Sequence, residues 1–345
     1  MNDDTDGVAS PDAASEAFKL LGSETRVGVL RALFDTDGGR VRPTTRTFTE
    51  LYEASDEATT AGFAYHLRQL VGHYLTKEER ADGPDTYALT YAGLQVARGV
   101  LTGTYTESVD CGPVSLPDPC PFCAETALEL EVSDNLTTVA CTTCERDVLA
   151  LPFPPGGFRS HDEKTLPGAF DTHHRHRISL MRDGNCPECA GSVAGRVELA
   201  ETGDEDEEDS ESENGGPPVA RASLDCGTCG YSLRCPVTVA VLGHPAVVSF
   251  AHDHDTSLDE RPIWNVGPEW GERVVSTDPL AVRVTLELDD ELLSLFVGRD
   301  LTVGHETRRP LDDDVGQTTR EPVSEGDESV DAERATSAES DSAAA

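Results

Sequence analysis

The sequence predicts an α+β protein built from several domains, and three observations carry that prediction. The first hundred residues read as helices followed by two short strands. Four Cys-x-x-Cys turns divide the middle of the chain into two cysteine-rich segments, and the last folded segment alternates between apolar and polar residues, as strands do. At about 100–200 residues per domain, the length of 345 residues leaves room for two or three cores.

The composition is strongly acidic. It has 65 Asp and Glu against 27 Lys and Arg, a formal charge of −38, and only three of the basic residues are lysines. An acidic surface that prefers arginine over lysine indicates adaptation to high salt, because dense carboxylates keep a protein hydrated. This charge excludes a chain that is basic overall and coats nucleic acid without discrimination.

The start of the chain and its hydropathy indicate a cytoplasmic protein without a membrane partner. The opening MNDDTDGVAS lacks the basic and apolar regions of a secretory signal. No run approaches the ~20 apolar residues that a membrane helix needs. In a reducing compartment, the paired spacing of the ten cysteines points to metal or redox chemistry and away from disulfides.

Residues 13–104 escape the acidification, with ten Lys and Arg against twelve Asp and Glu. A surface that must approach phosphate would explain this, and chance clustering in a short domain is the alternative. Three segments read as unfolded spacers with almost nothing to bury: a leader (1–12), an acidic insert (201–218) and an acidic tail (305–345). The remaining boundaries define five predicted parts: 13–104, 105–155, 156–184, 185–236 and 237–304.

The first part predicts three helices and a hairpin. Residues 13–34 predict one amphipathic helix, and Thr47 with Glu50 predicts a capping box at the start of a short second helix. A third helix is expected over about 59–72. Two short strands near 74–77 and 86–90 follow it. This is the order of a winged helix-turn-helix, in which the third helix enters the major groove of DNA and the hairpin loop lies along a backbone.

The side of the third helix that faces away from its apolar residues supplies candidate DNA contacts. Arg68 can read guanine and Gln69 adenine, while Thr60 lies where a helix N-terminus meets phosphate. The full set of candidates is Thr60, Tyr65, Arg68, Gln69, Lys77 and Arg80. His66 reads either as a packed, hydrogen-bonded histidine or as a base reader. A winged helix that mediates only protein contacts is the alternative for the whole part.

Three runs in this part resemble the ArsR-like winged-helix regulators of haloarchaea: LGSETRVGVLRAL (21–33), GFAYHLRQLVG (62–72) and TYALTYAG (86–93). The resemblance covers about residues 13–104. It implies that the third helix reads double-stranded DNA and that the following helix, over 91–103, helps to form a homodimer. Metal-sensing members carry cysteines on the helix before the recognition helix. Here that stretch reads TELYEASDE, so metal sensing by that route is not expected.

Eight cysteines predict two zinc sites. Cys120-Pro-Phe-Cys123 is followed after 17 residues by Cys141-Thr-Thr-Cys144. Such pairs present four thiolates tetrahedrally, about 2.3 Å from Zn²⁺, in a structural zinc ribbon. The second set, Cys186, Cys189, Cys226 and Cys229, has 36 residues between its pairs, and half of them are the acidic insert. Without the insert, 18 residues separate the two pairs, which is close to the spacing of the first set. We therefore predict a second ribbon, with the insert at the tip of its hairpin.

A four-thiolate site has no open position for water or substrate, so we do not expect an enzyme. Thiol chemistry and a redox switch that ejects zinc are the alternatives for the ribbons. Cys235 is expected to be a buried small hydrophobe, and Cys111 has no assigned role. His173 and His176 share one side of a helix expected over 167–181, either as a solvated face or as a further metal site.

The last folded part predicts a helix over 237–252 and strands over 272–276, 281–289 and 292–296. With both ribbons it resembles the C-terminal region of the same haloarchaeal regulators, which implies a ligand- or partner-sensing role. The sequence therefore predicts a DNA-binding transcriptional regulator with two structural zinc ions. The alternatives are an interaction adaptor of the transcription or RNA machinery that does not itself read DNA, and a zinc-dependent enzyme.

Overall fold

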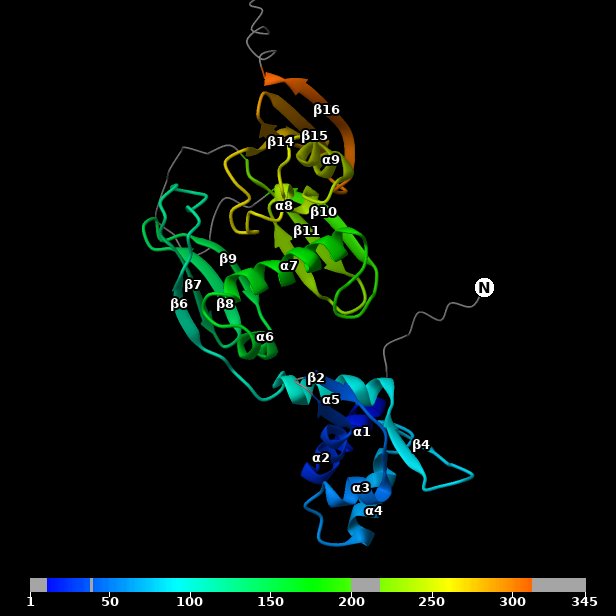
Figure 1. The fold of residues 1–345 in the computed structure, drawn as a ribbon. Coiled ribbons are helices and arrows are strands. Elements are labelled where there is room, and N and C mark those ends of the chain that lie inside the picture. The colour runs from blue at the N-terminus through cyan, green and yellow to red at the C-terminus, as the bar shows by residue number, and fades with distance from the viewer. Residues whose placement is uncertain (1–10, 38–39, 200–217, 312–345) are drawn as a thin grey trace, which may run out of the picture.

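The computed structural model describes residues 11–37, 40–199 and 218–311, which form a mixed α+β protein with several cores (Figure 1). Most of the predicted spacers lie outside these described ranges. The leader prediction is wrong at Pro11 and Asp12, which begin a helix, and the tail prediction is wrong at residues 305–310, which belong to a strand. In the described part of the chain, no helix is long and apolar enough to cross a bilayer.

The N-terminal part is a winged-helix arrangement. Its elements are α1 (Pro11–Lys19), α2 (Glu24–Ala32), β1 (Phe34–Asp37), β2 (Arg40–Pro43), β3 (Arg46–Thr47), α3 (Phe48–Glu53), α4 (Thr60–Leu70), β4 (Leu75–Glu78), β5 (Thr86–Leu89) and α5 (Tyr91–Thr102). The strands β3, β5 and β4 form an antiparallel sheet in that order. Phe63, Leu67 and Leu70 of α4 are buried in one core with Leu30 of α2 and Ala97 of α5. The predicted capping box between Thr47 and Glu50 is confirmed.

Two details of this part differ from the prediction. The helix expected over 13–34 is two helices, because Ser23 has an extended backbone and caps α2 by accepting from the Arg26 N–H at 3.5 Å. A hairpin of β1 and β2 follows, in which Asp35 pairs with Arg42. Its sequence signal was the Gly38-Gly39 pair between two short alternating runs, which is typical of a tight hairpin turn.

The middle of the chain contains two small sheets that pack against one long helix. Its elements are β6 (Cys111–Ser115), β7 (Leu128–Ser133), β8 (Leu136–Cys141), β9 (Asp147–Pro152), α6 (Pro155–Ser160), α7 (Leu166–Arg182), β10 (Val193–Leu199), β11 (Ala220–Cys226) and β12 (Ser232–Cys235). We call the β6–β9 sheet ribbon 1 and the β10–β12 sheet ribbon 2. Phe170 of α7 is buried with ribbon 1, while Ile178 and Met181 are buried with ribbon 2. Both sheets therefore pack against helix α7 (Figure 1).

The C-terminal part is a four-stranded antiparallel sheet with short helices packed on it. Its elements are α8 (Val237–Val241), α9 (Pro245–Asp253), β13 (Trp270–Thr277), β14 (Leu280–Leu288), β15 (Glu291–Gly298) and β16 (Val303–Pro310), and the strand order is β13-β14-β15-β16. The single helix expected over 237–252 is broken because His244 is extended and caps α9. Strand β16 was not predicted, since Arg308 and its neighbours lack apolar alternation.

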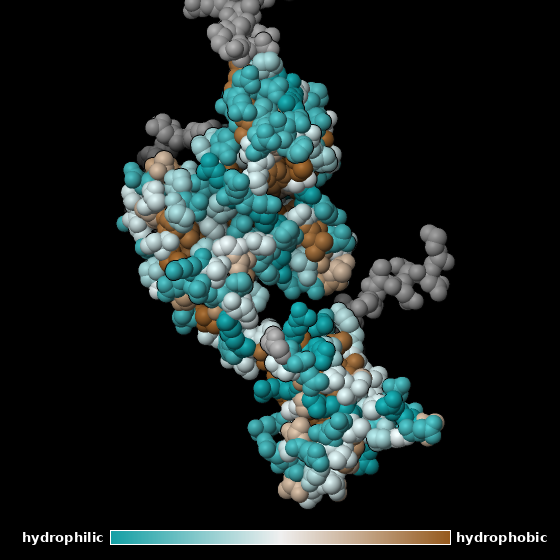
Figure 2. All heavy atoms as spheres, in the orientation of Figure 1, coloured by the Kyte–Doolittle hydropathy of each residue, from teal (hydrophilic) through white to brown (hydrophobic). Residues whose placement is uncertain are grey.

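The core of the C-terminal part continues into ribbon 2. Val197 of β10 and Ala220 of β11 are buried in the same cluster as Phe250 of α9 and Val282 of β14. Cys235, at the end of β12 in ribbon 2, is buried as predicted, and its burial raises the pKa of its thiol to about 12. Hydrophilic residues cover most of the face seen in Figure 2, in keeping with the acidic composition.

Candidate metal centres and nucleic-acid interface

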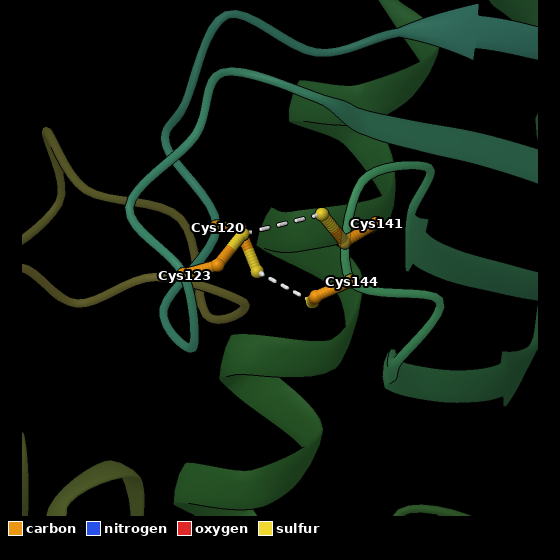
Figure 3. A group of neighbouring side chains, drawn as sticks. All are labelled: Cys120, Cys123, Cys141 and Cys144. Atoms are coloured by element: carbon orange, nitrogen blue, oxygen red, sulfur yellow. Dashed lines mark hydrogen bonds between the residues drawn. The ribbon is translucent and has the colours of Figure 1, made fainter.

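The four cysteines predicted for ribbon 1 converge at one end of its sheet. All four Sγ atoms lie within 4.8 Å of one another. Cys120 Sγ is 3.8 Å from Cys144 Sγ, and Cys123 Sγ is 3.7 Å from Cys141 Sγ (Figure 3). A tetrahedron of sulfurs about 2.3 Å from Zn²⁺ has S···S edges of about 3.8 Å. The thiolates of this cluster therefore fit a zinc site with four cysteine ligands.

Ribbon 2 holds a matching cluster. Cys186 Sγ is 3.6 Å from Cys229 Sγ, and Cys189 Sγ is 3.6 Å from Cys226 Sγ. Strands β10 and β11 pair from Val193 with Cys226 to Leu199 with Ala220, so the acidic insert lies in their connection, as the sequence predicted. Both tetrahedral four-cysteine clusters are consistent with two structural zinc ions.

The four Cys-x-x-Cys turns share one backbone geometry. In each, the N–H of the first cysteine donates to the carbonyl oxygen five residues later, at 2.8 to 3.0 Å. The residue after the second cysteine has a left-handed backbone in every turn, with φ of 61° at Ala124, 57° at Glu145, 57° at Ala190 and 75° at Gly230. The fold thus holds both thiols of each turn on one side before a metal binds.

Backbone amides favour the thiolate form of the first cysteine in the second turn of each cluster, Cys141 in ribbon 1 and Cys226 in ribbon 2. Hydrogen bonds from the backbone, first from Cys144 and Cys229 respectively, lower the pKa of Cys141 to about 7 and of Cys226 to about 6. The Phe122 and Thr228 N–H groups lie 3.4 Å from the Sγ atoms of Cys120 and Cys226. Burial raises the pKa of Cys123 to about 12, and the Cys229 thiol raises that of Cys189 to about 12. The deprotonated form that metal binding needs is therefore favoured at Cys141 and Cys226.

A loop from the C-terminal part supports the first cluster. The Trp264 Nε1–H donates to Asp118 Oδ2 at 3.1 Å, and Asn265 Nδ2 donates to the Pro119 carbonyl oxygen at 2.5 Å. Both acceptors immediately precede Cys120. The loop is fixed in turn by Asp171 of α7, which accepts from the Ile263 N–H at 2.7 Å. Sequence reasoning missed Trp264 and Asn265 because 146 residues separate each of them from its acceptor next to Cys120.

The histidines of α7 do not add a third metal centre. Among the described residues, the two cysteine clusters are the groups of three or more metal-type ligands that lie close together. His173 is half-buried beside the Phe153 ring, and His176 is exposed. His174 is 1% exposed, and neither of its ring nitrogens has a hydrogen bond. Burial, followed by the charges of His173 and Arg177, lowers its pKa to about 3.

The outward side of α4 carries the residues predicted to contact DNA. Thr60 and Arg68 are exposed, Tyr65 is 52% exposed, and Gln69 is half-buried. Helix α4 contains no acidic residue. Glu57 lies on the flank of the helix near Gly62 and is 3.8 Å from His66 Nε2. His66 also lies 3.3 Å from an Arg26 nitrogen, so it is packed and partnered.

The wing, the loop between β4 and β5, is less favourable to phosphate than the sequence predicted. Lys77 Nζ is 2.7 Å from Asp85 and 3.5 Å from Glu79, and these two carboxylates occupy its charge. Hydrogen bonding to Asp85 raises the pKa of Lys77. Arg80 is exposed at the tip of the loop.

Family comparisons divide the chain as its cores do. A family model described as a domain of unknown function, DUF7351, matches residues 117–303, which span ribbon 1 except β6, all of ribbon 2 and most of the C-terminal sheet. A second domain of unknown function, DUF7347, matches residues 14–100, the winged-helix part. No curated protein and no solved structure matches the chain.

Proposed function

The chain belongs to the DUF7351 family, whose function is unknown, and we propose that it is a transcriptional regulator that binds double-stranded DNA through its winged helix. The observation that carries the proposal is the exposed outward side of α4, a helix that contains no acidic residue of its own. Elsewhere the chain averages more than two acidic residues for each basic one. A helix that is spared carboxylates on its outward side suits a surface that approaches phosphate.

Specific contacts would come from the stripe of Ala61, Tyr65 and Arg68. These positions follow helical spacing. The Glu57 carboxylate lies beside Gly62, about 100° round the helix from the stripe and on the same side as Gln69. The Arg68 Nε–H donates to the Ala64 carbonyl oxygen of its own helix at 3.2 Å, and its side chain is exposed. The guanidinium is therefore available to turn toward a guanine edge. Because counterion release adds little at high salt, base contacts should carry much of the affinity.

Dimerisation through α5, which the resemblance to the ArsR-like regulators implies, completes the proposal, and we add α1 as a second contact. Helix α1 buries none of its residues, and Phe18 is 70% exposed. Tyr91, at the start of α5, is 77% exposed, and Val100 and Leu101 near its end are only half-buried. These apolar residues suit a contact with a second copy, which would pair two recognition helices across a palindromic site.

The two metals would serve structure alone. Each set of four thiolates fills a tetrahedral coordination shell, so neither centre leaves a position for a substrate. We therefore propose that the protein is not a zinc enzyme. Zinc would instead fix the knuckles that pack against α7 and the loop at Trp264.

The test is selection of bound sequences from random duplexes, followed by shift assays at high KCl. We expect an enriched palindromic motif, and Arg68→Ala should weaken binding to it by roughly tenfold, as loss of one bidentate base contact does. Arg221→Ala is the matched control, because Arg221 is an exposed arginine in ribbon 2. Unchanged affinity of Arg68→Ala for the selected motif would overturn the assignment of α4.

One observation favours the alternative, an adaptor that does not read DNA. The wing carries Glu78, Glu79, Asp82 and Asp85, which repel phosphate along the path of the loop. An adaptor would enrich no sequence in the selection and would co-purify with a component of the transcription or RNA machinery.

A further inference from the structure

The β13–β16 sheet has one face covered by α8 and α9, and no helix of the described residues covers its other face. Val282, Val284 and Leu295 point into the core beneath α9. Strand alternation places their neighbours on the opposite side. This second set comprises Gly271, Arg273, Ala281, Arg283, Thr285, Glu287, Leu292, Ser294, Phe296, His305, Thr307 and Arg309, and we call it the outer face.

The strand register builds a cationic and aromatic row across the middle of this face. Arg273 pairs with Arg283, Arg283 pairs with Phe296, and Phe296 pairs with His305. The His305 ring lies 5.9 Å from the Phe296 ring, tilted by 30°. The parallel row next to it carries hydroxyls, because Thr285 pairs with Ser294 and Ser294 pairs with Thr307.

The two arginines of the row oppose each other without an anion between them. Like charges directly across an antiparallel pair destabilise a sheet. In the described part of the chain, no carboxylate forms an ion pair with either guanidinium, and Arg283 Nε is buried without a hydrogen bond. By contrast, Arg308 on the other side of β16 has Asp253 at 2.5 Å and also contacts Glu291. In a chain of charge −38, this unneutralised pair indicates an external anion.

The side chains of the row are more exposed at its ends than in its middle. Arg273 and His305 are exposed at its two ends, and Arg283 and Phe296 are half-buried between them. Glu287, toward the end of β14, is the one carboxylate among the outer-face positions. Ser294 and Leu292 of the outer face are each only 5% exposed, so the hydroxyl row is largely covered. The accessible part of the face therefore combines positive charge and a ring pair on a sheet four strands wide, which is about 14 Å.

We infer that the outer face binds single-stranded nucleic acid, with a phosphate held between Arg273 and Arg283 and a base stacked on Phe296 beside His305. Phosphate supplies the anion that the opposed arginines require, and a guanidinium fork matches it bidentately. A flat aromatic platform beside a cationic track is how sequence-tolerant surfaces hold unpaired strands. In a duplex the faces of the bases are stacked on one another, so the rings of this row could not reach them.

Fluorescence anisotropy of the full-length, zinc-loaded protein tests this inference. The probe is a labelled oligothymidylate of about 12 nucleotides, within the range that such platforms cover. Phe296→Leu should weaken binding by about tenfold, because one stacked base is lost. Arg273→Ser should weaken it as well, and should lower the slope of log Kd against log [KCl] by about 0.7, the value for one phosphate on a single strand.

Matched controls separate this site from the winged helix and from a folding defect. Arg234→Ser changes an exposed arginine of β12 and should leave the affinity unaltered. Arg68→Ala should leave binding of the single strand unaltered while it weakens binding of the selected duplex. Because Arg273 is exposed and opposes another arginine, Arg273→Ser should keep the zinc content of wild type and should melt at no lower temperature.

Three results would overturn the inference. The first is equal affinity of wild type and Arg273→Ser for the oligonucleotide. The second is equal affinity for an abasic strand of the same length, which would exclude base stacking. The third is displacement of the strand by polyglutamate at equal charge concentration, which would mark the face as a site for an acidic protein segment. Loss of duplex binding alone would leave this inference standing and count against the winged-helix proposal only.

Discussion

Ribbon 1 and ribbon 2 close their metal sites with the same backbone hydrogen bonds but differ in how the clusters are buried. In ribbon 1, Cys120 and Cys141 belong to the hydrophobic cluster of Phe170 and Trp264, and Cys123 and Cys144 are half-buried against it. In ribbon 2, Cys186 and Cys226 are buried, but Cys189 and Cys229 are exposed. The same local geometry therefore lies within a core in ribbon 1 and has one side open to solvent in ribbon 2. Local motif and tertiary burial are separable properties of a metal site.

Removing a ligand should give the largest difference between the ribbons. Cys141→Ser and Cys226→Ser should each lower the zinc content from two ions to one. Zinc contributes about 10–16 kcal/mol of apparent binding free energy to small structural sites. Cys141→Ser should unfold the core around Phe170 and yield aggregated protein, whereas Cys226→Ser should remain folded with a lowered melting temperature. Metal analysis and thermal unfolding measure this, and equal losses of stability would contradict the comparison.

A chelator should remove zinc from ribbon 2 faster than from ribbon 1. Exposed thiolates are open to attack, so excess EDTA should remove one zinc faster than the other, in two phases. Analysis of the zinc that remains bound to the protein after rapid desalting, at successive times, follows the release. The fast phase should be absent from Cys226→Ser, whose remaining zinc is in ribbon 1. A single phase in the wild-type protein would show that burial does not govern access.

Acid should destabilise the packing of α7 against ribbon 1 because it protonates His174. Its pKa of about 3 lies below the ordinary histidine value of 6.5, so between these values the unfolded chain binds the proton and the folded chain does not. Stability is then lost as pH falls below 6.5. His174→Leu removes this loss, so we expect its free energy of unfolding to gain about 1–2 kcal/mol on wild type between about pH 7 and pH 5. Ile178→Leu, where α7 packs against ribbon 2, is the control and should show no such pH-dependent gain.

The smallest effect concerns the arginine that stacks on each ribbon. Arg177 lies 4.7 Å from the centre of the Tyr231 ring, donates to its hydroxyl at 3.1 Å and is largely buried. Arg146 lies 5.3 Å from the Phe122 ring at an exposed position. Arg177→Ala should lower the free energy of unfolding by about 1–2 kcal/mol, and Arg146→Ala by less than about 0.5 kcal/mol. Denaturant titration measures both, and the reverse order would contradict the assigned roles.

Spacing and capping signals could be read directly from the chain. The Cys-x-x-Cys pairs identified all eight ligands, and subtracting the acidic insert located the second hairpin, because knuckle geometry depends on a few adjacent residues. Thr47 and Glu50 located the start of α3 for the same reason. The break at Ser23 and the Gly38-Gly39 turn were local signals as well, but the apolar stripe of the first helix masked the former.

Pairings between distant segments could not be read in the same way. No local pattern links Trp264 to Asp118, or Val197 to the core beneath α9, because such contacts depend on how the sheets settle on α7. The pairing of Lys77 with Asp85 likewise depends on the wing folding back on itself. A basic residue can be identified in a sequence, but its availability to a ligand cannot.

By itself, the sequence determined the α+β class, the two sets of thiolates and the order of elements in the winged-helix part, since these follow from periodicity and spacing over a few residues. Only the tertiary structure decided which cluster has two exposed cysteines, and which arginines lack a carboxylate partner. The reason is that burial and charge pairing depend on neighbours contributed by segments up to 146 residues apart.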